Sequence, residues 1–244
     1  MHPATPAQRP IRRRKLYEEV ALRIEEMIRE GRYAPGDQLP AERELMEELG
    51  VGRSAVREAM LSLQKMGLVT VNSGERARVT IPTAQVLVSE LAGAARLLLA
   101  QEGGVERFQE ARALFEIGLA RLAAQRATPE DLARLEAALE ANRAAIGDRE
   151  QFMRTDVAFH YAIATIPRND IFTSVHNAVV EWLTEQRDIS GRAPGAGEAA
   201  YAAHRRIYEA IAAHDPVAAE QAMQDHLDAV VKLYWRVRQS APGA

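Results

Sequence analysis

A run of three helical patterns followed by a hairpin pattern, close to the N-terminus, limits the fold of this chain more than any other feature. Apolar residues at helical spacing predict an amphipathic helix over residues 15–30. Two shorter helices are predicted over residues 41–49 and 53–66, and the tight turn Gly50–Val51–Gly52 separates them. Two helices joined by a glycine-containing turn are typical of a helix-turn-helix.

A predicted β-hairpin follows the third helix directly. Residues 68–71 and 76–80 have strand patterns, and the turn Asn72–Ser73–Gly74 lies between them. A hairpin in this position is a wing, so residues 15–81 are predicted to form a winged helix-turn-helix domain.

Pro82 marks the end of this domain, and the sequence beyond it is helical throughout. Seven helices are predicted, over residues 83–101, 105–126, 129–146, 149–165, 170–190, 198–214 and 216–239. The predicted fold is therefore mainly α, with a winged helix-turn-helix domain and an all-helical antiparallel bundle over residues 82–240. A chain of 244 residues with 47% apolar residues is long enough for two such domains.

The winged helix-turn-helix fits contacts with double-stranded DNA, because the N-terminal end of its second helix is the end that enters a major groove. The candidate contact residues lie at that end, on the preceding helix or at the wing tip, and they are Arg43, Arg53, Ser54, Arg57 and Gly74. The alternative is that Arg53 and Arg57 belong to a salt-bridged helix face that includes Glu58.

The distribution of charge supports a nucleic-acid partner for the N-terminal region. The whole chain has a net charge of −3, but residues 1–81 hold 14 basic and 12 acidic residues. A basic cluster runs from Arg9 to Lys15, so residues 1–14 are predicted to form a basic disordered arm. The arm is either a solvated tail or, like Arg76 and Arg78 of the wing, a phosphate or minor-groove contact.

The lack of cysteine and of long apolar segments excludes several classes of protein and site. Without cysteine the chain has no disulfide and no cysteine-ligated zinc, so any metal is held by His, Asp or Glu. No apolar core of a secretory signal follows the basic N-terminus, and charged residues interrupt the most apolar stretch, residues 86–100. We therefore expect a cytoplasmic protein that does not associate with a membrane.

Four residues of the C-terminal region form a candidate metal site. Asp156 and His160 are one helical turn apart on the predicted helix over residues 149–165, although such a pair alone is more often a surface contact or a helix cap. His204 and His226 lie on separate predicted helices, and their apolar neighbours turn them toward a bundle core. Together the four can hold Zn, Ni or Mn and leave a coordination position for a ligand oxygen.

The N-terminal region resembles the GntR family of bacterial regulators, in its FadR-like subfamily. The segments that carry this resemblance are residues 39–45, 50–59 and 67–69. The resemblance implies that three of the candidate arginines contact DNA, namely Arg43, Arg53 and Arg57.

The C-terminal region resembles the effector-sensing domain of the metal-containing branch of that subfamily. The pattern of this branch is Asp-x3-His followed by one His on each of two later helices, and it is matched by Asp156, His160, His204 and His226. The resemblance implies one divalent metal ion per chain, with Zn first and Ni or Mn as alternatives. It also implies that Arg112 faces an effector cavity, whereas the alternative for Arg112 is an internal salt bridge to Glu116.

Further segments are similar to the sialic-acid-responsive repressors of the subfamily, and they cover residues 72–79, 90–93 and 166–169 and the basic arm. This resemblance implies a homodimeric repressor that binds a palindromic or repeated operator and is released by a small carboxylate or sugar acid, with sialic acid as the first candidate. The alternatives are another organic acid, and a metal that is structural or is itself the sensed ligand. An enzyme is not expected, because no general base lies at a motif spacing beside the ligands.

Overall fold

The computed structural model describes residues 15–72 and 75–240, and these divide into two compact units. The first unit ends at Leu87 and the second begins at Val88, within helix α4 (Ala84–Ser89). This division lies beyond the domain boundary predicted at Pro82. The predicted basic arm, residues 1–14, and the wing-tip residue Gly74 lie outside the described residues.

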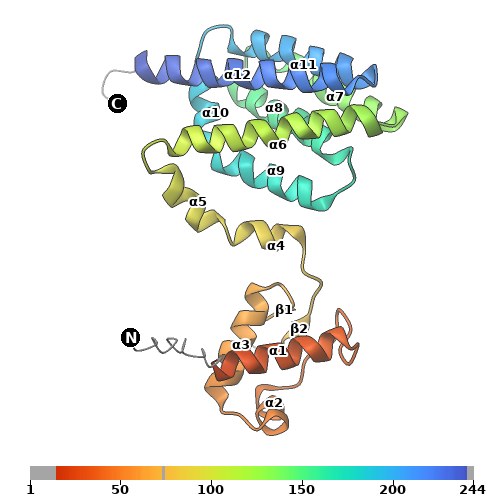
Figure 1. Cartoon of the computed structure of the whole chain (residues 1–244), viewed down its shortest axis with the longest axis vertical. Coiled ribbons are helices and arrows are strands. Elements are labelled where there is room, and N and C mark those ends of the chain that lie inside the picture. The colour runs from red at the N-terminus through yellow and green to blue at the C-terminus, as the bar shows by residue number, and fades with distance from the viewer. Residues whose placement is uncertain (1–14, 73–74, 241–244) are drawn as a thin grey trace, which may run out of the picture. The chain divides into compact units, whose positions relative to one another are not determined.

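The N-terminal unit has the predicted order of three helices and an antiparallel hairpin (Figure 1). In the hairpin, Val69 pairs with Val79 and Thr70 with Arg78. The bounds are α1 (Leu16–Arg29), α2 (Glu42–Leu49), α3 (Arg53–Lys65), β1 (Val69–Thr70) and β2 (Arg78–Val79).

The two strands are shorter than the sequence predicts. The chain leaves the ladder after Thr70 to close a turn in which the N–H of Glu75 donates to the carbonyl of Asn72. On its other side, β2 contacts the segment before α2, because the N–H of Val79 donates to the carbonyl of Asp37 at 2.8 Å. The sequence did not indicate this additional pairing.

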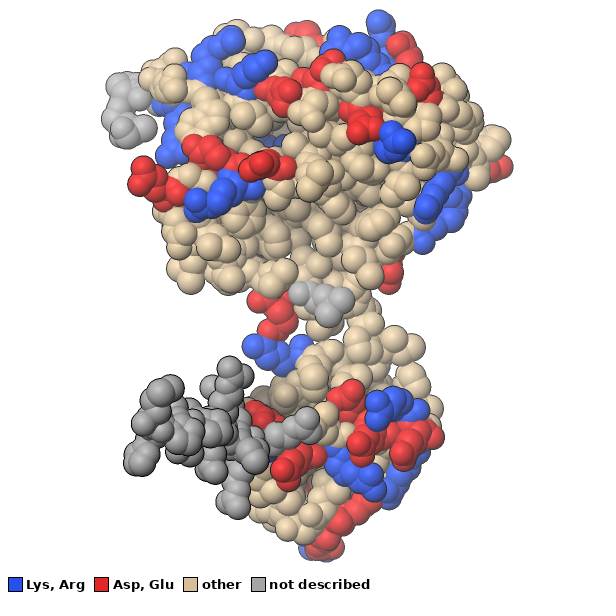
Figure 2. Space-filling model, in the orientation of Figure 1, with Lys and Arg blue, Asp and Glu red and all other residues tan. Residues whose placement is uncertain are grey.

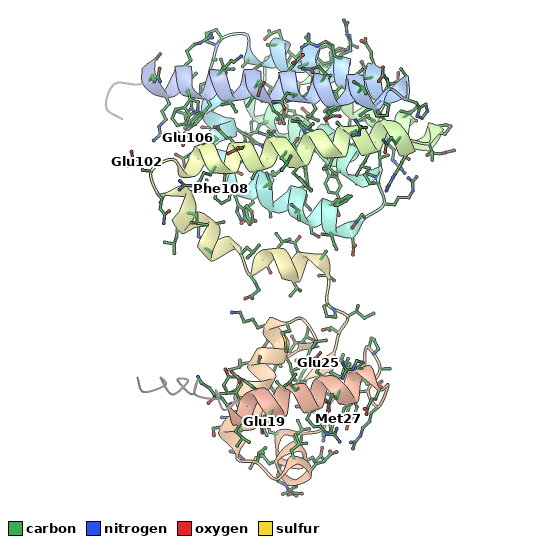
Figure 3. The ribbon with its side chains drawn as sticks, viewed as in Figure 1. Glu19, Glu25, Met27, Glu102, Glu106 and Phe108 are labelled. Atoms are coloured by element: carbon green, nitrogen blue, oxygen red, sulfur yellow. The ribbon has the colours of Figure 1, made fainter. Side chains whose placement is uncertain are left out.

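Helix α1 has a buried and an exposed face, as its apolar spacing predicts. Val20, Ile24 and Met27 are buried, whereas Glu19 is exposed. Figure 3 labels Glu19 and Met27 on this helix. Leu16, at the first turn, is 53% exposed and does not join this core.

The turn between α2 and α3 depends on Gly50. Its φ of +64° lies in the left-handed region, which residues with a side chain rarely adopt. Val56 and Leu63 on the inner face of α3 are completely buried against α1. The turn and these contacts leave the N-terminal end of α3 facing outward.

The C-terminal unit is a bundle in which the long helices α6 and α12 lie side by side (Figure 1). Helix α8 contacts α6, α7 and α9, and α11 contacts α7 and α12. No helix among the described residues has the length and apolar character needed to cross a bilayer. The bounds are α5 (Ala92–Leu99), α6 (Gly104–Arg126), α7 (Pro129–Ala144), α8 (Arg149–Thr165), α9 (Asp170–Trp182), α10 (Thr184–Ser190), α11 (Ala196–Ala212) and α12 (Pro216–Ser240).

The prediction of one helix over residues 83–101 is wrong, because the chain forms α4 and α5 with a turn between them. At the end of α4 the N–H of Leu91 donates to the carbonyl of Val88, three residues earlier, at 3.0 Å. The valines and the serine of α4 are weak helix formers, which favours an interruption here.

The prediction of one helix over residues 170–190 is also wrong, because α9 and α10 meet at Leu183. The hydroxyl of Thr184 donates to the carbonyl of Val180 at 2.9 Å. This side-chain hydrogen bond competes with the main-chain bonding that a continuous helix requires.

Candidate functional site

The N-terminal end of α3 is exposed and open to an anion. The side chains of Arg53, Ser54 and Arg57 are all exposed, as contacts with DNA require. The residue before the helix is Gly52, so no side chain caps this end, and the first turn holds no acidic residue. The main-chain N–H groups of this turn and the helix dipole therefore favour a phosphate group here.

Arg57 is joined to the first helix of the motif. Its Nε donates a hydrogen bond to each carboxylate oxygen of Glu42 on α2, both at 3.0 Å. A salt bridge is thus present, but it joins two helices and does not use Glu58. Among the described residues, all hydrogen bonds of Arg57 leave from Nε, and the side chain is 61% exposed. Its two terminal nitrogen atoms are therefore free to face a base edge.

The other arginines of this unit differ in how they are held. Nε of Arg43 lies 3.4 Å from Oε1 of Glu47, and Nη1 of Arg76 lies 4.0 Å from Oε2 of Glu44. Within the described part of the chain, Arg53 forms no ion pair. Figure 2 shows the resulting mixture of basic and acidic side chains on the visible face of the unit. Exposed ion pairs contribute little to stability, so a phosphate can replace these carboxylates at low cost.

One of the two arginines of the wing is hydrogen-bonded within the unit. Gly74 lies outside the described residues, so its predicted contact with DNA stays a prediction. Nη1 of Arg78 donates to the carbonyl of Gly36 at 2.6 Å. Arg78 thus joins the hairpin to the segment before α2.

The four candidate metal ligands come together inside the C-terminal bundle. Asp156 and His160 lie on α8, His204 on α11 and His226 on α12, and one ligand atom from each lies within 4.8 Å of the others. Nε2 of His204 is 3.3 Å from Nε2 of His226 and 3.4 Å from Oδ1 of Asp156. The three imidazoles are buried and the carboxylate is partly buried.

The chemistry of these donors fits a divalent cation. Nε2 of His160 is buried without a hydrogen-bond partner among the described residues, although buried polar atoms ordinarily have one. Burial lowers the pKa of His204 to about 3 and the pKa of His226 well below its usual value, so both imidazoles are neutral at pH 7. Burial raises the pKa of Asp156, but the positive charge of the Arg187 guanidinium outweighs it and keeps the carboxylate ionised. Neutral imidazoles with one carboxylate suit Zn, Ni or Mn.

A second layer of charged residues surrounds the ligands. The carboxylate of Glu116 on α6 lies beside Nδ1 of His160 and accepts a hydrogen bond from Nε of Arg112 at 2.6 Å. Nη1 of Arg187 on α10 lies 2.5 Å from Oδ2 of Asp156. Burial opposes the ionisation of Glu116, but Arg112 and His160 hold its pKa well below the usual range. The ionised Glu116 thus orients the ring of His160 through Nδ1, which leaves Nε2 as the nitrogen available to a cation.

A cavity of about 310 Å³ lies next to the ligands. Asp156 and His226 line it, together with the two guanidinium groups of Arg112 and Arg187. Arg112 pairs with Glu116 and also lines this cavity, so the internal salt bridge does not exclude a role in effector binding. Apolar side chains complete much of the wall, among them Phe152, Met153, Val230 and Leu233.

Three residues that contact the candidate ligands were not identified as site residues from the sequence, namely Glu116, Arg187 and Asn142. Glu116 was considered only as a partner of Arg112, and its spacing of four residues was a usable signal. Arg187 and Asn142 lie in no local motif, because their partners are on other helices. Asn142 places Oδ1 3.0 Å from Nδ1 of His204.

Comparison with known proteins gives consistent matches over most of the chain. Residues 16–79 match the family described as bacterial regulatory proteins, gntR family, and residues 108–229 match the FCD domain. A protein named HTH-type transcriptional repressor NanR, from Enterobacter sp. (strain 638), is 44% identical over 225 residues, which cover 91% of this chain and 86% of that protein. The protein of the same name from Cronobacter sakazakii (strain ATCC BAA-894) is 43% identical over 228 residues, with the same two coverages.

Two solved structures of similar proteins agree with these matches. The Streptococcus agalactiae GntR structure has a TM-score of 0.58 and 29% sequence identity, and the match covers 88% of this chain and 99% of that chain. The E. coli McbR/YncC structure shares the fold, with a TM-score of 0.52 at 19% identity over 92% of this chain and 99% of that chain. The chain therefore belongs to the GntR family of bacterial transcription regulators, and an FCD domain follows its helix-turn-helix domain.

Proposed function

We propose that this regulator is a repressor that reads double-stranded DNA through α3 and the wing. Arg53 and Arg57 contact base edges, and Ser54 with the nearby main-chain amides contacts phosphate. Arg43 reaches the groove or the backbone, and Gly74 is the proposed contact from the wing. The exposed, uncapped end of α3 supports this assignment, and the relatives named NanR are repressors by name.

We also propose that each chain holds one divalent cation in the C-terminal domain, with Zn as the first candidate and Ni or Mn as alternatives. The observation that carries this proposal is the convergence of four suitable donors beside a cavity. When bound, the cation supplies a Lewis-acidic position for a ligand oxygen. The proposed ligands are Asp156, His160, His204 and His226.

The cavity favours a small anionic effector. Arg112 and Arg187 both face it, and Nε and Nη2 of Arg187 have no hydrogen-bond partner among the described residues. Guanidinium groups bind carboxylates through paired hydrogen bonds, and the apolar wall suits the rest of a small molecule. The effector in this proposal is a small carboxylate or a sugar acid, with sialic acid first and another organic acid as the alternative. Its binding releases the operator.

The active form in this proposal is a cytoplasmic homodimer, formed through the C-terminal domain over residues 82–240. Leu97 and Leu114 are 73% and 81% exposed, and Figure 2 shows a broad area without charged side chains on the visible face of this unit. Contiguous exposed apolar areas mark interfaces, and an area without charged side chains that contains exposed leucines fits such a contact. A two-fold dimer presents two recognition helices to a palindromic or repeated operator.

Binding measurements on the zinc-loaded full chain test this function. We expect tighter binding to a duplex from the chain's own promoter region than to a random duplex of equal length at the same salt concentration. Sialic acid, or another member of a panel of sugar acids and small carboxylates, should weaken this binding. The same acid should raise the melting temperature only when metal is present. Equal affinity for the two duplexes would contradict the proposal.

A second candidate keeps the DNA-binding role and makes the metal structural. The observation that favours it is that the ligands join α8, α11 and α12 in the interior of the bundle. In that case, removing the metal would loosen the C-terminal domain, while the metal-free protein that remained folded would respond to the acid as before.

A further inference from the structure

His204 is held by a series of buried, hydrogen-bonded polar groups that begins at backbone carbonyls of α8. Oγ1 of Thr155 lies 3.0 Å from the carbonyl oxygens of both Gln151 and Phe152. Nδ2 of Asn142 donates to Oγ1 of Thr155 at 3.1 Å, and Oδ1 of Asn142 lies 3.0 Å from Nδ1 of His204. Asn142 and His204 are completely buried, and Thr155 is nearly so.

In this series of hydrogen bonds, the direction of each bond is fixed by the one before it. The hydroxyl of Thr155 has a single proton, which it donates to the main-chain carbonyl groups because these only accept. The oxygen of Thr155 is then an acceptor, so the amide nitrogen of Asn142 faces it and the amide oxygen faces His204. An amide oxygen cannot donate. Nδ1 of His204 therefore carries the proton, and Nε2 keeps its lone pair.

We propose that Asn142 is a positioning residue that selects the metal-binding tautomer of His204, and that Thr155 fixes the orientation of Asn142. This inference rests on the proposed metal site. The unprotonated Nε2 is the atom that lies near Asp156 and His226, at 3.4 and 3.3 Å. In the other tautomer an N–H group points at these donors, and the proton must leave before a cation can bind.

The choice of a neutral amide at position 142 is consistent with this role. Second-layer partners of metal-binding histidines are carboxylates, main-chain carbonyls or waters as a rule, and all of them accept from the ring N–H. Glu116 has this position beside His160 and brings a negative charge. Asn142 accepts in the same way beside His204 without adding a second buried charge.

Titration of the metal-free full chain with Zn against a chromophoric chelator tests the inference. Asn142→Leu keeps the approximate volume and removes the acceptor, and we expect it to lower Zn affinity by about 10- to 100-fold. Thr155→Val replaces the hydroxyl by a methyl group of similar size and should also lower Zn affinity. Thr155→Ser is its matched control, because it retains the hydroxyl, and should bind Zn like the unmodified chain. Asn142→Asp retains the acceptor and should keep most of the affinity.

Nitrogen NMR of the imidazole rings in the metal-free protein provides a second measurement. We expect a proton on Nδ1 of His204 in the unmodified chain and in Thr155→Ser, and a mixture of tautomers in Asn142→Leu. If Asn142→Leu lowers the melting temperature but changes neither the tautomer nor the Zn affinity, the inference is overturned. If the unmodified chain binds no Zn, the proposed metal site fails first. Thr155→Val decides the matter if Asn142→Leu does not fold.

Discussion

Replacement of Arg57 by alanine tests the reading of DNA at a single side chain. Arg57 is 61% exposed, and its hydrogen bonds within the described residues go only to Glu42. Its loss therefore costs the folded state little. A pair of hydrogen bonds from its terminal nitrogen atoms to a guanine provides about 1–3 kcal/mol of discrimination. We expect Arg57→Ala to lower operator affinity roughly 5- to 150-fold with an unchanged melting temperature.

Glu42→Gln tests the same contact between Arg57 and DNA by changing the residue that holds Arg57. The change weakens the hold on Nε of Arg57 and removes a negative charge near the DNA. We expect affinity for random DNA to rise, because repulsion from phosphate falls, while discrimination against a changed base pair decreases. Glu47→Gln is the matched control, since it removes the same charge on the same helix beside Arg43. It should raise affinity for random DNA without affecting the base read by Arg57.

The assay is fluorescence anisotropy at one salt concentration with three duplexes. These are the operator, the operator with the contacted base pair changed, and a random sequence. If Arg57→Ala loses the same factor on all three, Arg57 contacts phosphate only and the argument is refuted. If the effects of Glu42→Gln and Arg57→Ala on discrimination are additive in the double variant, the two side chains do not act together.

Two further predictions concern the C-terminal domain. Burial raises the pKa of Asp131, but hydrogen bonds from Thr128, Arg168 and Arg134 lower it to about 2. The ionised carboxylate therefore stabilises the fold fully above the unfolded pKa near 3.9, and this stabilisation is lost as pH falls through about 2. Asp131→Asn should therefore lower the free energy of unfolding by about 2 kcal/mol at pH 7 and make no difference below pH 2, and equal denaturation midpoints at pH 7 would contradict this. His204→Ala should lower metal content and the response to the effector, measured by elemental analysis and anisotropy, while effector-free operator binding stays the same. A matching loss of operator binding would point to general misfolding.

The fold of the N-terminal unit was predictable because its determinants are local. The positive φ of Gly50 and the burial of Val56 and Leu63 follow from a glycine turn and from helical spacing. The contact between Val79 and Asp37 was not predictable, because an edge strand can accept many partners and nothing in either segment specifies the other. The breaks within the predicted helices over residues 83–101 and 170–190 were missed. Helix propensity is a weak signal, and packing decides whether a helix continues through residues of low propensity.

In the candidate metal site, likewise, the ligands could be predicted from the sequence and the residues that orient them could not. Histidine is scarce in this chain, with six in total, so the Asp156–His160 spacing and two later histidines stood out. The residues that orient these ligands did not stand out in the sequence, because asparagine, glutamate and arginine are common residue types. Asn142 meets His204 only after α7 and α11 have packed together, and Arg187 meets Asp156 only through the contact of α10 with the bundle.

The balance of charge in this buried cluster leads to a final prediction. The carboxylates of Asp156 and Glu116 are matched by the guanidinium groups of Arg112 and Arg187, the imidazoles of His204 and His226 are neutral, and His160 contributes no negative charge. A divalent cation therefore adds positive charge that no described residue of the cluster compensates, and uncompensated buried charge is costly. A carboxylate entering the cavity reduces this excess, so metal and acid should each strengthen the binding of the other. Arg187→Met removes one positive charge and should raise Zn affinity while weakening acid binding, as calorimetry can measure. An uncharged amide analogue that binds the zinc-loaded protein as tightly as the acid would show that charge does not couple the two ligands.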